Sequence, residues 1–364
     1  MKEKTKLFAK NLCFLSFVLM IFSCGFFGGI NTCDTVTAVE TYGYSEVNAY
    51  PSHLYVCGVP IGIKMQSDGV IVTGFIGFKN ENDKFVNPSF DAGILVGDRI
   101  VSVSGEEVHS TVDLQNCIYK STGSCDVNVI RNDEVCTITV TPDVSAESHQ
   151  NKLGLWVKDN AAGIGTLTYI NPENNQYGAL GHGIGGAEYC GLFEMSDGTL
   201  YDAAIGGCVK GKSGSPGELQ GYFLNSENEN GIGNVETNCD RGIYGTISES
   251  VVNDMDEYGI LMPVARMSEI YSGDATIIST VSGTTPKEYA VKIELIKNDS
   301  SETSKGMSIY VTDRDLLAET GGIVQGMSGS PILQDGKLIG AVTHVLVNDP
   351  TRGYGIFIEN MLDR

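Results

Sequence analysis

Gly326-Met327-Ser328-Gly329-Ser330-Pro331 is a tight turn in which glycines flank a serine. Such a turn exposes the serine hydroxyl and leaves neighbouring backbone N–H groups free to point at one spot, which suits a nucleophile beside its own oxyanion hole. Residues 332–342 then read as a strand, an Asp335-Gly336 hairpin turn and a second strand. The stretch therefore predicts a β-rich fold with Ser328 as a candidate nucleophile ahead of a hairpin.

This order of turn, proline and hairpin resembles the nucleophile loop of chymotrypsin-like serine peptidases. The resemblance implies a chymotrypsin-like double β-barrel over residues 153–364, in which the backbone amides of Gly326 and Ser328 hold the oxyanion. Met327 stands where trypsin-like enzymes carry an aspartate. An activation switch that pairs such an aspartate with a new N-terminus is therefore not expected.

The composition indicates a packed globular protein of two or three domains. The chain has 364 residues, of which 41% are hydrophobic and 19% charged, and its 45 glycines favour β structure with many turns. The net charge of −21 argues against a nucleic-acid partner, because phosphate binding needs a basic face. Ten cysteines include no Cys-x-x-Cys pair, so we expect no metal site and no cofactor, while disulfides and free thiols both stay open.

The first 30 residues are typical of an export segment. Lysines at four of the first ten positions precede a mostly apolar run, 11–30, which is also long enough to span a bilayer. Ser23 and Gly25 fit the small-residue positions of a cleavage site, so a cleaved signal peptide and a retained anchor helix are both open. Residues 31–53 have no clear periodicity and are interpreted as a tether. In either case we expect the remainder of the chain to lie outside the cytoplasm.

Residues 54–142 show short alternating strands and resemble a PDZ domain. Their central stretch, 88–106, reads as a short helix ending in Ala-Gly, a Val-Gly-Asp turn, a strand and a further glycine turn. The resemblance implies that residues 112–119 form the helix beside a peptide groove and that Pro60-Ile61-Gly62-Ile63 form its carboxylate-binding loop. PDZ domains bind extended peptides by adding a strand to a sheet edge, whereas the alternative is a small β domain that only spaces the catalytic unit from the membrane. The polar stretch 143–152 is interpreted as a linker.

Only two of the five histidines, His182 and His344, lie within residues 153–364. His182 is flanked by glycines at the end of an apparent hairpin and comes well before Ser328, which is the place of the general-base histidine in chymotrypsin-like enzymes. His182 is therefore the predicted base that takes the serine proton. His344 follows the expected strand 338–342, whose end lines the substrate pocket in this architecture, and is interpreted as a pocket or structural residue.

A third group is needed to orient the imidazole and to stabilise its positive charge. Asp313 and Asp315 lie shortly before Ser328, and Asp313, which follows the expected strand 307–311, is the better candidate, with Asp315 as the reserve. An aspartate that begins a helix is commonly an N-cap, and chymotrypsin-like chains carry their catalytic aspartate much further upstream of the serine. Spacing alone therefore leaves capping and catalysis both open for Asp313.

The order of export segment, PDZ-like domain, histidine, aspartate and serine resembles the SpoIVB family, serine peptidases of endospore-forming bacteria. The resemblance implies that His182, Asp313 and Ser328 carry catalysis. A second serine motif, Lys212-Ser213-Gly214-Ser215-Pro216, echoes the nucleophile loop, but in this family it is a structural turn, so Ser213 is not the expected nucleophile. The resemblance extends from end to end, and its most specific stretches are 178–184, 214–219, 320–331, 340–345 and 348–350.

For function, the resemblance implies an exported serine endopeptidase of sporulation signalling that processes itself. Such an enzyme acts in the space between the forespore and mother-cell membranes, either anchored or released by cleavage. It cleaves a regulatory membrane protein, which lets an intramembrane metalloprotease process pro-sigma-K. Its expected partners are that membrane protein, its own chain as substrate and a peptide ligand of the PDZ-like domain.

Two other functions remain open. Quality-control proteases of the HtrA type also combine a chymotrypsin-like unit with PDZ domains, but they place the PDZ domain after the peptidase, and the order here is the reverse. A PDZ adaptor with a decayed peptidase domain would have no activity, although candidates for all three triad roles are present in this chain.

Overall fold

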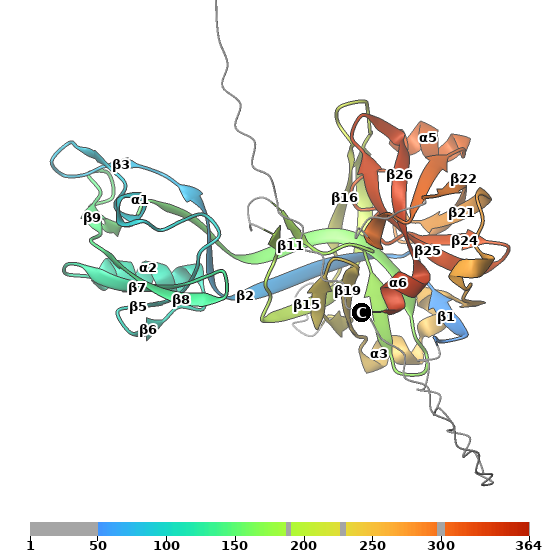
Figure 1. Cartoon of the computed structure of the whole chain (residues 1–364), viewed down its shortest axis with the longest axis horizontal. Coiled ribbons are helices and arrows are strands. Elements are labelled where there is room, and N and C mark those ends of the chain that lie inside the picture. Colours follow the sequence, from blue (N-terminus) through green and yellow to red (C-terminus); the bar gives the residue numbers. More distant parts are fainter. Residues whose placement is uncertain (1–49, 187–190, 226–230, 297–302, 364) are drawn as a thin grey trace, which may run out of the picture. The chain divides into compact units, whose positions relative to one another are not determined.

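The computed structural model describes residues 50–186, 191–225, 231–296 and 303–363. The predicted export segment, 1–30, and most of the predicted tether, 31–53, lie outside the described residues. Within these ranges no helix is long and apolar enough to cross a membrane. The described chain is mostly β structure, as the sequence predicts, with short helices between strands (Figure 1).

Two long strands, β2 (Pro60–Phe75) and β11 (Leu155–Ile170), organise the fold (Figure 1). They pair antiparallel with each other over most of their length. On its other side β2 pairs with β15 (Asp197–Val209) near its start and with β5 (Arg99–Val103) near its end. This strand pair therefore belongs to the PDZ-like half and to the peptidase half of the chain at once.

The burial pattern of β2 explains how it serves two cores. Ile61 and Ile63 face the core of the peptidase half, whereas Val70 and Val72 face the core of the PDZ-like half. Along β2 the core-facing residues are therefore odd-numbered at first and even-numbered later. A bulge in the pairing with β11 lies between the two parts and accompanies this change of face. Gly69, between the two sets, has a φ of +110°, and a Cβ there would lie 2.6 Å from a carbonyl oxygen of β5.

The PDZ-like half contains a sheet in the order β11-β2-β5-β7-β8, in which β7 is Cys125–Arg131 and β8 is Glu134–Val140. Helix α2 (Thr111–Lys120) packs its buried face into the core of this half. The helix predicted at residues 112–119 is α2, and the Ser110 side chain caps it by accepting from the Asp113 N–H. α1 (Pro88–Ala92) ends at a left-handed glycine, as the Ala-Gly signal predicts. The predicted linker contains β9 (Asp143–Val144) and β10 (Asn151–Lys152), which pair with each other.

The C-terminal half closes into a barrel in the order β21-β22-β23-β26-β25-β24. The predicted hairpin is β24 and β25, joined by Asp335 and Gly336, which both have the positive φ that a type I′ turn needs. Inward-facing side chains such as Ile277, Ile309 and Ile332 fill the barrel core. The strands are β21 (Gly273–Ser279), β22 (Lys287–Leu295), β23 (Met307–Val311), β24 (Pro331–Gln334), β25 (Lys337–Leu346) and β26 (Asp349–Phe357).

The N-terminal half of the peptidase domain is a sheet built on β11, β12 (Gln176–Ala179) and β19 (Gly242–Thr246). β1 (His53–Val56), at the end of the predicted tether, pairs with β11 and with β20 (Ile260–Pro263), so it is part of this half. β16 (Glu218–Phe223) pairs with β15. Of the two barrels that the resemblance implies, the described strand pairing closes the C-terminal one, whereas this half is continuous with the PDZ-like sheet through β2 and β11.

The remaining elements are short. They are β3 (Phe78–Lys79), β4 (Phe85–Val86), β6 (Glu106–Glu107), β13 (Gly185–Gly186), β14 (Gly191–Leu192), β17 (Gly233–Asn234), β18 (Thr237–Cys239), α3 (Glu249–Asn253), α4 (Met255–Tyr258), α5 (Arg314–Thr320) and α6 (Ile358–Leu362), with single 3₁₀ turns at Met267–Glu269 and Thr303–Lys305.

Candidate active site

Ser328, His182 and His344 line one cavity of about 440 Å³. His182 comes from the segment that follows β12 in the N-terminal half of the peptidase domain. Ser328 and His344 come from the C-terminal half, the first from the loop before β24 and the second from β25. The structure therefore brings the predicted nucleophile and the predicted base to the same cavity.

The nucleophile loop has the backbone that its glycines predict. Gly326 and Gly329 have φ of +94° and +93°, so the chain turns sharply on either side of Ser328. The side chain of Met327 is buried in the barrel core and anchors the loop. Two backbone hydrogen bonds tighten the turn, from Met327 N–H to the Val324 carbonyl at 3.1 Å and from Ser330 N–H to the Met327 carbonyl at 3.0 Å.

Strand β11 holds the nucleophile loop from the side. Thr166 N–H donates to the Ser328 carbonyl at 3.0 Å, and the Thr166 hydroxyl donates to the Gly326 carbonyl at 3.0 Å. The Thr168 hydroxyl donates to the Gly329 carbonyl at 2.7 Å. Both threonines are buried, so these bonds fix the peptide planes of the loop away from water.

The amides predicted to form the oxyanion hole are available. The Gln325 carbonyl accepts from Leu219 N–H at 2.8 Å, and because a trans peptide points its N–H opposite its carbonyl, the Gly326 N–H faces away from β16. Within the described ranges neither the Gly326 N–H nor the Ser328 N–H donates to another protein group. Backbone amides without protein partners can serve as donors to a tetrahedral oxyanion.

The Ser328 hydroxyl donates to the Thr343 carbonyl at 2.9 Å. In this arrangement the serine proton is directed at the backbone of β25 and not at His182. Proton transfer from Ser328 to His182 therefore requires rotation of the Ser328 side chain away from the Thr343 carbonyl.

His182 sits on a strained turn that directs it out of β12. The two residues before it, Leu180 and Gly181, both have positive φ, +68° and +69°, and for a leucine this conformation is costly and typical of functional sites. Nδ1 of His182 lies 2.9 Å from the Gly183 carbonyl oxygen, which can only accept, so Nδ1 carries the proton and Nε2 keeps its lone pair. Desolvation lowers the pKa of His182, and the Gly183 carbonyl partly offsets this by raising it. The site therefore holds a neutral imidazole in the tautomer of a general base.

Asp313, the predicted orienting carboxylate, does not line this cavity. Its Oδ1 accepts from the N–H groups of Asp315 and Leu316 at 3.0 and 2.9 Å, which makes it the N-cap of α5, and its Oδ2 accepts from Ala290 N–H at 3.3 Å. Asp315, the reserve candidate, is exposed in the first turn of α5 and does not line the cavity either. The structure thus brings together two of the three predicted triad residues.

The sequence analysis interprets His344 as a pocket or structural residue, and the structure places it in the lining of this cavity. Its ring centroid lies 4.9 Å from that of His182, with the ring planes inclined by 34°. His344 lies within β25, which pairs with the strand directly after the nucleophile loop, and spacing in the sequence gave no way to see that the two histidines meet.

The second serine motif has a packing role. The Ser213 hydroxyl donates to the Asn348 carbonyl at 2.9 Å, and Gly214 N–H donates to the Val347 carbonyl at 2.9 Å. Ser213 does not line the cavity, whereas Pro216 of the same segment does. The segment therefore supports the wall of the site, in agreement with the structural reading of this turn.

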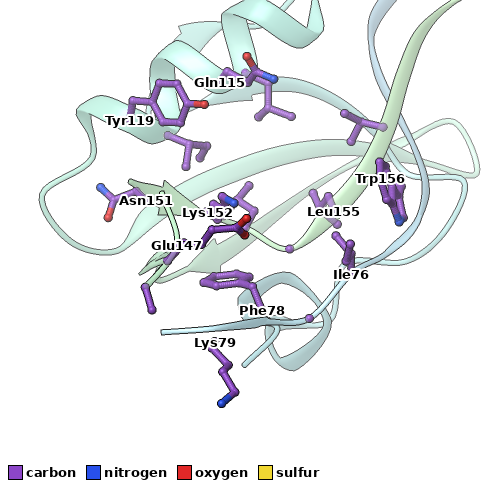
Figure 2. A pocket seen from close by; sticks show the side chains of 18 of the residues that line it. Ile76, Phe78, Lys79, Gln115, Tyr119, Glu147, Asn151, Lys152, Leu155 and Trp156 are labelled. Atoms are coloured by element: carbon purple, nitrogen blue, oxygen red, sulfur yellow. The ribbon is translucent and has the colours of Figure 1, made fainter. Parts of the chain in front are cut away.

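A second cavity, of about 830 Å³, lies beside α2 in the PDZ-like half (Figure 2). Leu114, Ile118 and Tyr119 of α2 line one side, and the start of β11 lines the other with Leu155 and Trp156. In this part of β11 the described pairing is with β2 alone, so its other edge has no strand partner among the described residues. A free strand edge beside a helix is the arrangement that binds an extended peptide by strand addition.

The predicted carboxylate-binding residues lie away from this groove. Pro60, Ile61, Gly62 and Ile63 are in the first half of β2, paired with β11, and all four are buried. They cannot present free amides to a peptide, because Ile61 to Ile63 are also paired with β15 on the other side. The loop that enters the groove is Leu153-Gly154, and the glycine has a φ of +79°. The signal that could have identified it is the apolar-Gly-apolar stretch directly after the predicted linker.

Comparison with known proteins agrees with this architecture. The model of the SpoIVB peptidase S55 family matches residues 149–362, and the PDZ domain model matches residues 60–141. No curated protein matches the chain. Among solved structures, the crystal structure of Rv3671c protease in its inactive form is similar at 12% sequence identity, over 55% of this chain and 81% of that chain, with a TM-score of 0.28.

Proposed function

The chain belongs to the SpoIVB peptidase S55 family, and from this premise we propose that it is an exported serine endopeptidase in which Ser328 is the nucleophile and His182 the general base. The observation that supports this assignment is the single cavity that both residues line, beside two backbone amides without protein partners. Nucleophile, base and oxyanion donors are the minimum set for acyl transfer.

The proposed reaction uses these groups in order. Ser328 Oγ turns from the Thr343 carbonyl, gives its proton to His182 Nε2 and bonds to the carbonyl carbon of the scissile peptide. The Gly326 and Ser328 N–H groups hold the oxyanion of the tetrahedral intermediate. His182 then returns the proton to the leaving amine, and the C–N bond breaks to leave an acyl-enzyme. Water activated by the same imidazole hydrolyses the ester and restores the serine.

The walls of the cavity indicate what lies beside the scissile bond. Ile164, Leu180 and Ile184 line it from the N-terminal half, and Val345 and Val347 from the end of β25 and the turn after it. No charged side chain is among the described lining residues unless a histidine is protonated. We therefore expect an apolar substrate side chain to fill this cavity, because only such a side chain is desolvated without loss of hydrogen bonds.

The biological role that the family supports is sporulation signalling. The proposed substrates are the chain itself and a regulatory membrane protein whose cleavage lets an intramembrane metalloprotease process pro-sigma-K. The proposed place of action is the space between the forespore and mother-cell membranes, with the enzyme anchored or released. The groove beside α2 is the proposed site for a peptide of such a partner.

The test is self-cleavage followed on a gel, together with labelling by a fluorophosphonate, which reacts with activated serines. We compare the wild-type chain with Ser328→Ala, His182→Ala and the matched control Ser213→Ala. Loss of the nucleophile or base lowers the rate by a factor on the order of 10⁴, whereas Ser213→Ala retains cleavage and labelling.

Three outcomes would contradict the proposal in different ways. An unlabelled wild-type chain that leaves a protein substrate whole points to an adaptor with a decayed peptidase domain. Labelling that survives in Ser328→Ala places the nucleophile elsewhere. Broad degradation of unfolded proteins without preference for apolar cleavage sites favours a quality-control protease.

A further inference from the structure

Strand β11 contributes to two sites, the peptide groove at its start and the nucleophile loop near its end. Leu155 and Trp156 line the groove opposite Tyr119 of α2 (Figure 2). Further along the same strand, Thr166 N–H donates to the Ser328 carbonyl at 3.0 Å. A ligand in the groove and the nucleophile are therefore in contact with one continuous element.

The start of β11 can accept an additional strand. Its outer edge has no strand partner among the described residues. The Gly154 carbonyl accepts from Ile76 N–H, directly after β2, at 3.0 Å. Because a trans peptide directs its N–H opposite its carbonyl, the Leu155 N–H points away from β2 and toward the free edge. An extended peptide can pair with β11 here and place apolar side chains against Leu114 and Ile118 of α2.

Asp159 connects the two walls of the groove. Its Oδ2 accepts from Thr111 N–H, at the start of α2, at 2.7 Å. Its backbone carbonyl accepts from the hydroxyl of Ser67, a buried residue of β2, at 3.1 Å. A change in the spacing between α2 and β11 therefore acts on β11 at Asp159.

The part of β11 between Asp159 and the nucleophile loop is a regular ladder. From Asn160 to Thr166 it pairs with β2 in one unbroken register, whereas the register shifts just before this part, between Lys158 and Asn160. The seven steps from Asp159 to Thr166 span about 23 Å of extended strand. Rigid secondary elements carry coupling over such distances, so a displacement at Asp159 reaches Thr166.

The nucleophile has two arrangements that such a displacement can rebalance. In the described one the Ser328 hydroxyl donates to the Thr343 carbonyl at 2.9 Å, and in the reactive one it is rotated toward His182. The Ser328 carbonyl is bonded to Thr166, so a shift of Thr166 moves Ser328 itself. Because the described arrangement is the unreactive one, a ligand that favours the other raises the reactivity of Ser328.

We propose that a peptide added as a strand to the start of β11 activates Ser328, and that Asp159 connects the groove to the nucleophile loop. The peptide class is an extended segment with apolar last residues and a free terminal carboxylate. Lys152, which also lines the groove, supplies a positive charge beside the Leu155 N–H for that carboxylate. The inference rests on the proposed serine peptidase function and adds its regulation.

The first experiment follows both sites in the wild-type chain. Trp156 is the single tryptophan, so its fluorescence reports peptide binding in the groove. We titrate hexapeptides that end in Val, Leu or Phe with a free carboxylate and measure the rate of fluorophosphonate labelling at Ser328. We expect labelling to become about 10-fold faster at saturation, a common size for coupling between sites. The same peptides as C-terminal amides are the control, because they reach the active site equally but lack the carboxylate.

A reversible peptide boronate tests the coupling in the reverse direction. Boronates form a tetrahedral adduct with a serine nucleophile, which requires the reactive arrangement. Linkage predicts that the boronate tightens hexapeptide binding at Trp156 by the same factor by which the hexapeptide tightens boronate binding. In Ser328→Ala the boronate should leave the Trp156 titration unchanged.

Substitution of Asp159 separates coupling from binding. We expect Asp159→Ala to bind peptide and to label at the basal wild-type rate without stimulation, whereas Asp159→Asn keeps an acceptor for Thr111 N–H and most of the stimulation. The matched control is Asp113→Ala. Asp113 accepts from His109 N–H and the Ser110 hydroxyl at the start of α2, and makes no hydrogen bond to β11 within the described ranges. Thermal melting verifies that each variant is folded.

Three results overturn the coupling, and a fourth overturns the function on which it rests. The coupling fails if no hexapeptide changes the Trp156 signal, if bound peptide leaves the labelling rate unchanged or lowers it, or if folded Asp159→Ala is stimulated as strongly as the wild type. A wild-type chain that is never labelled at Ser328, with or without bound peptide, is not a serine peptidase, and the failure then lies with the proposed function.

Discussion

Gly329 shows how one residue fixes the position of the nucleophile. Its φ is +93°, and a Cβ would overlap the Thr166 carbonyl oxygen and lie 2.5 Å from the Leu180 nitrogen. Glycine is therefore required both by the backbone conformation and by the close approach of β11 and the residue after β12. The same approach is what lets Thr168 reach the Gly329 carbonyl.

We predict that Gly329→Ala lowers the free energy of unfolding by about 3 kcal/mol or more, because strain and backbone overlap add. Thermal or urea denaturation measures it. The matched control is Gly336→Ala, at a φ of +73° in the hairpin turn with nothing within 4 Å of its Cβ, which costs about 1 kcal/mol. Equal destabilisation by the two changes would show that the contact with β11 adds nothing.

The lowered pKa of His182 predicts the pH dependence of activity. The base must be neutral, and its pKa lies below the ordinary value of 6.5 because the ring is desolvated. We therefore expect kcat/KM to rise with pH along an acid limb whose apparent pKa is below 6.5 and to be level at pH 7. A limb centred above pH 7 would contradict the desolvated site.

The lowered pKa of His182 also makes the free energy of unfolding depend on pH. As pH falls below 6.5, His182 is protonated in the unfolded state before it is protonated in the folded state, because its pKa is lower in the folded state. This group therefore reduces the free energy of unfolding at acid pH and has no effect well above pH 6.5.

At the scale of elements, β11 is the support of the oxyanion hole. Thr166, near its end, bonds to the nucleophile loop with both its N–H and its hydroxyl. The hydroxyl bond to the Gly326 carbonyl is partly buried, so its loss leaves a poorly solvated acceptor and loosens the loop that carries the oxyanion amides.

We predict that Thr166→Val lowers stability by about 1–2 kcal/mol and kcat by about 10-fold. Single-turnover acylation and urea denaturation measure the two effects. Thr137→Val serves as control, since the exposed Thr137 hydroxyl donates to Asn128 on the neighbouring strand and touches no part of the site. Were both variants to acylate at the wild-type rate, β11 would be a passive neighbour of the loop.

Sequence reasoning succeeded for elements whose signals are local. The turn at Ser328 and the hairpin after it are determined by glycines, a proline and an Asp-Gly pair within twenty residues, and the structure has both. The helix beside the groove was predicted, but the carboxylate-binding stretch was placed at residues 60–63, because the second wall of the groove comes from the start of β11, beyond the last strand of the predicted PDZ-like domain. The role of Asp313 was ambiguous for a physical reason. An aspartate directly before a helix is expected both for an N-cap and for a triad member at this place in the sequence.

At the scale of the whole molecule, the two family matches do not mark separable units. The matches cover residues 60–141 and 149–362, yet β2 lies in the first and its long partner β11 in the second. β15 and β1 in the peptidase half also depend on this pair, since they bond to β2 and β11. An isolated match would expose long unpaired strand edges, which favour aggregation.

We predict that residues 149–364 expressed alone do not form a monomeric folded domain, because β2 and β1 are missing. Residues 60–141 alone lack β11 and with it one wall of the groove. Far-UV circular dichroism and size-exclusion chromatography test both fragments against residues 50–364, which contain every described strand. A stable, soluble monomer of the shorter peptidase fragment would show that the shared strands are dispensable.

The shared strand pair also bears on how such a chain can be inherited. Domain shuffling by recombination works when the breakpoint falls in a loop that makes no strand pairs in either product. Judged from the family matches alone, the short segment between them would be such a loop. A crossover there would produce a chimaeric protein with β2 from one parent gene and β11 from the other. The side chains that face each other across this strand pair would then come from different sequences. Lineages of this architecture should therefore exchange both segments together or neither, and a survey of chimaeric genes would show breakpoints before β1 and none between β2 and β11.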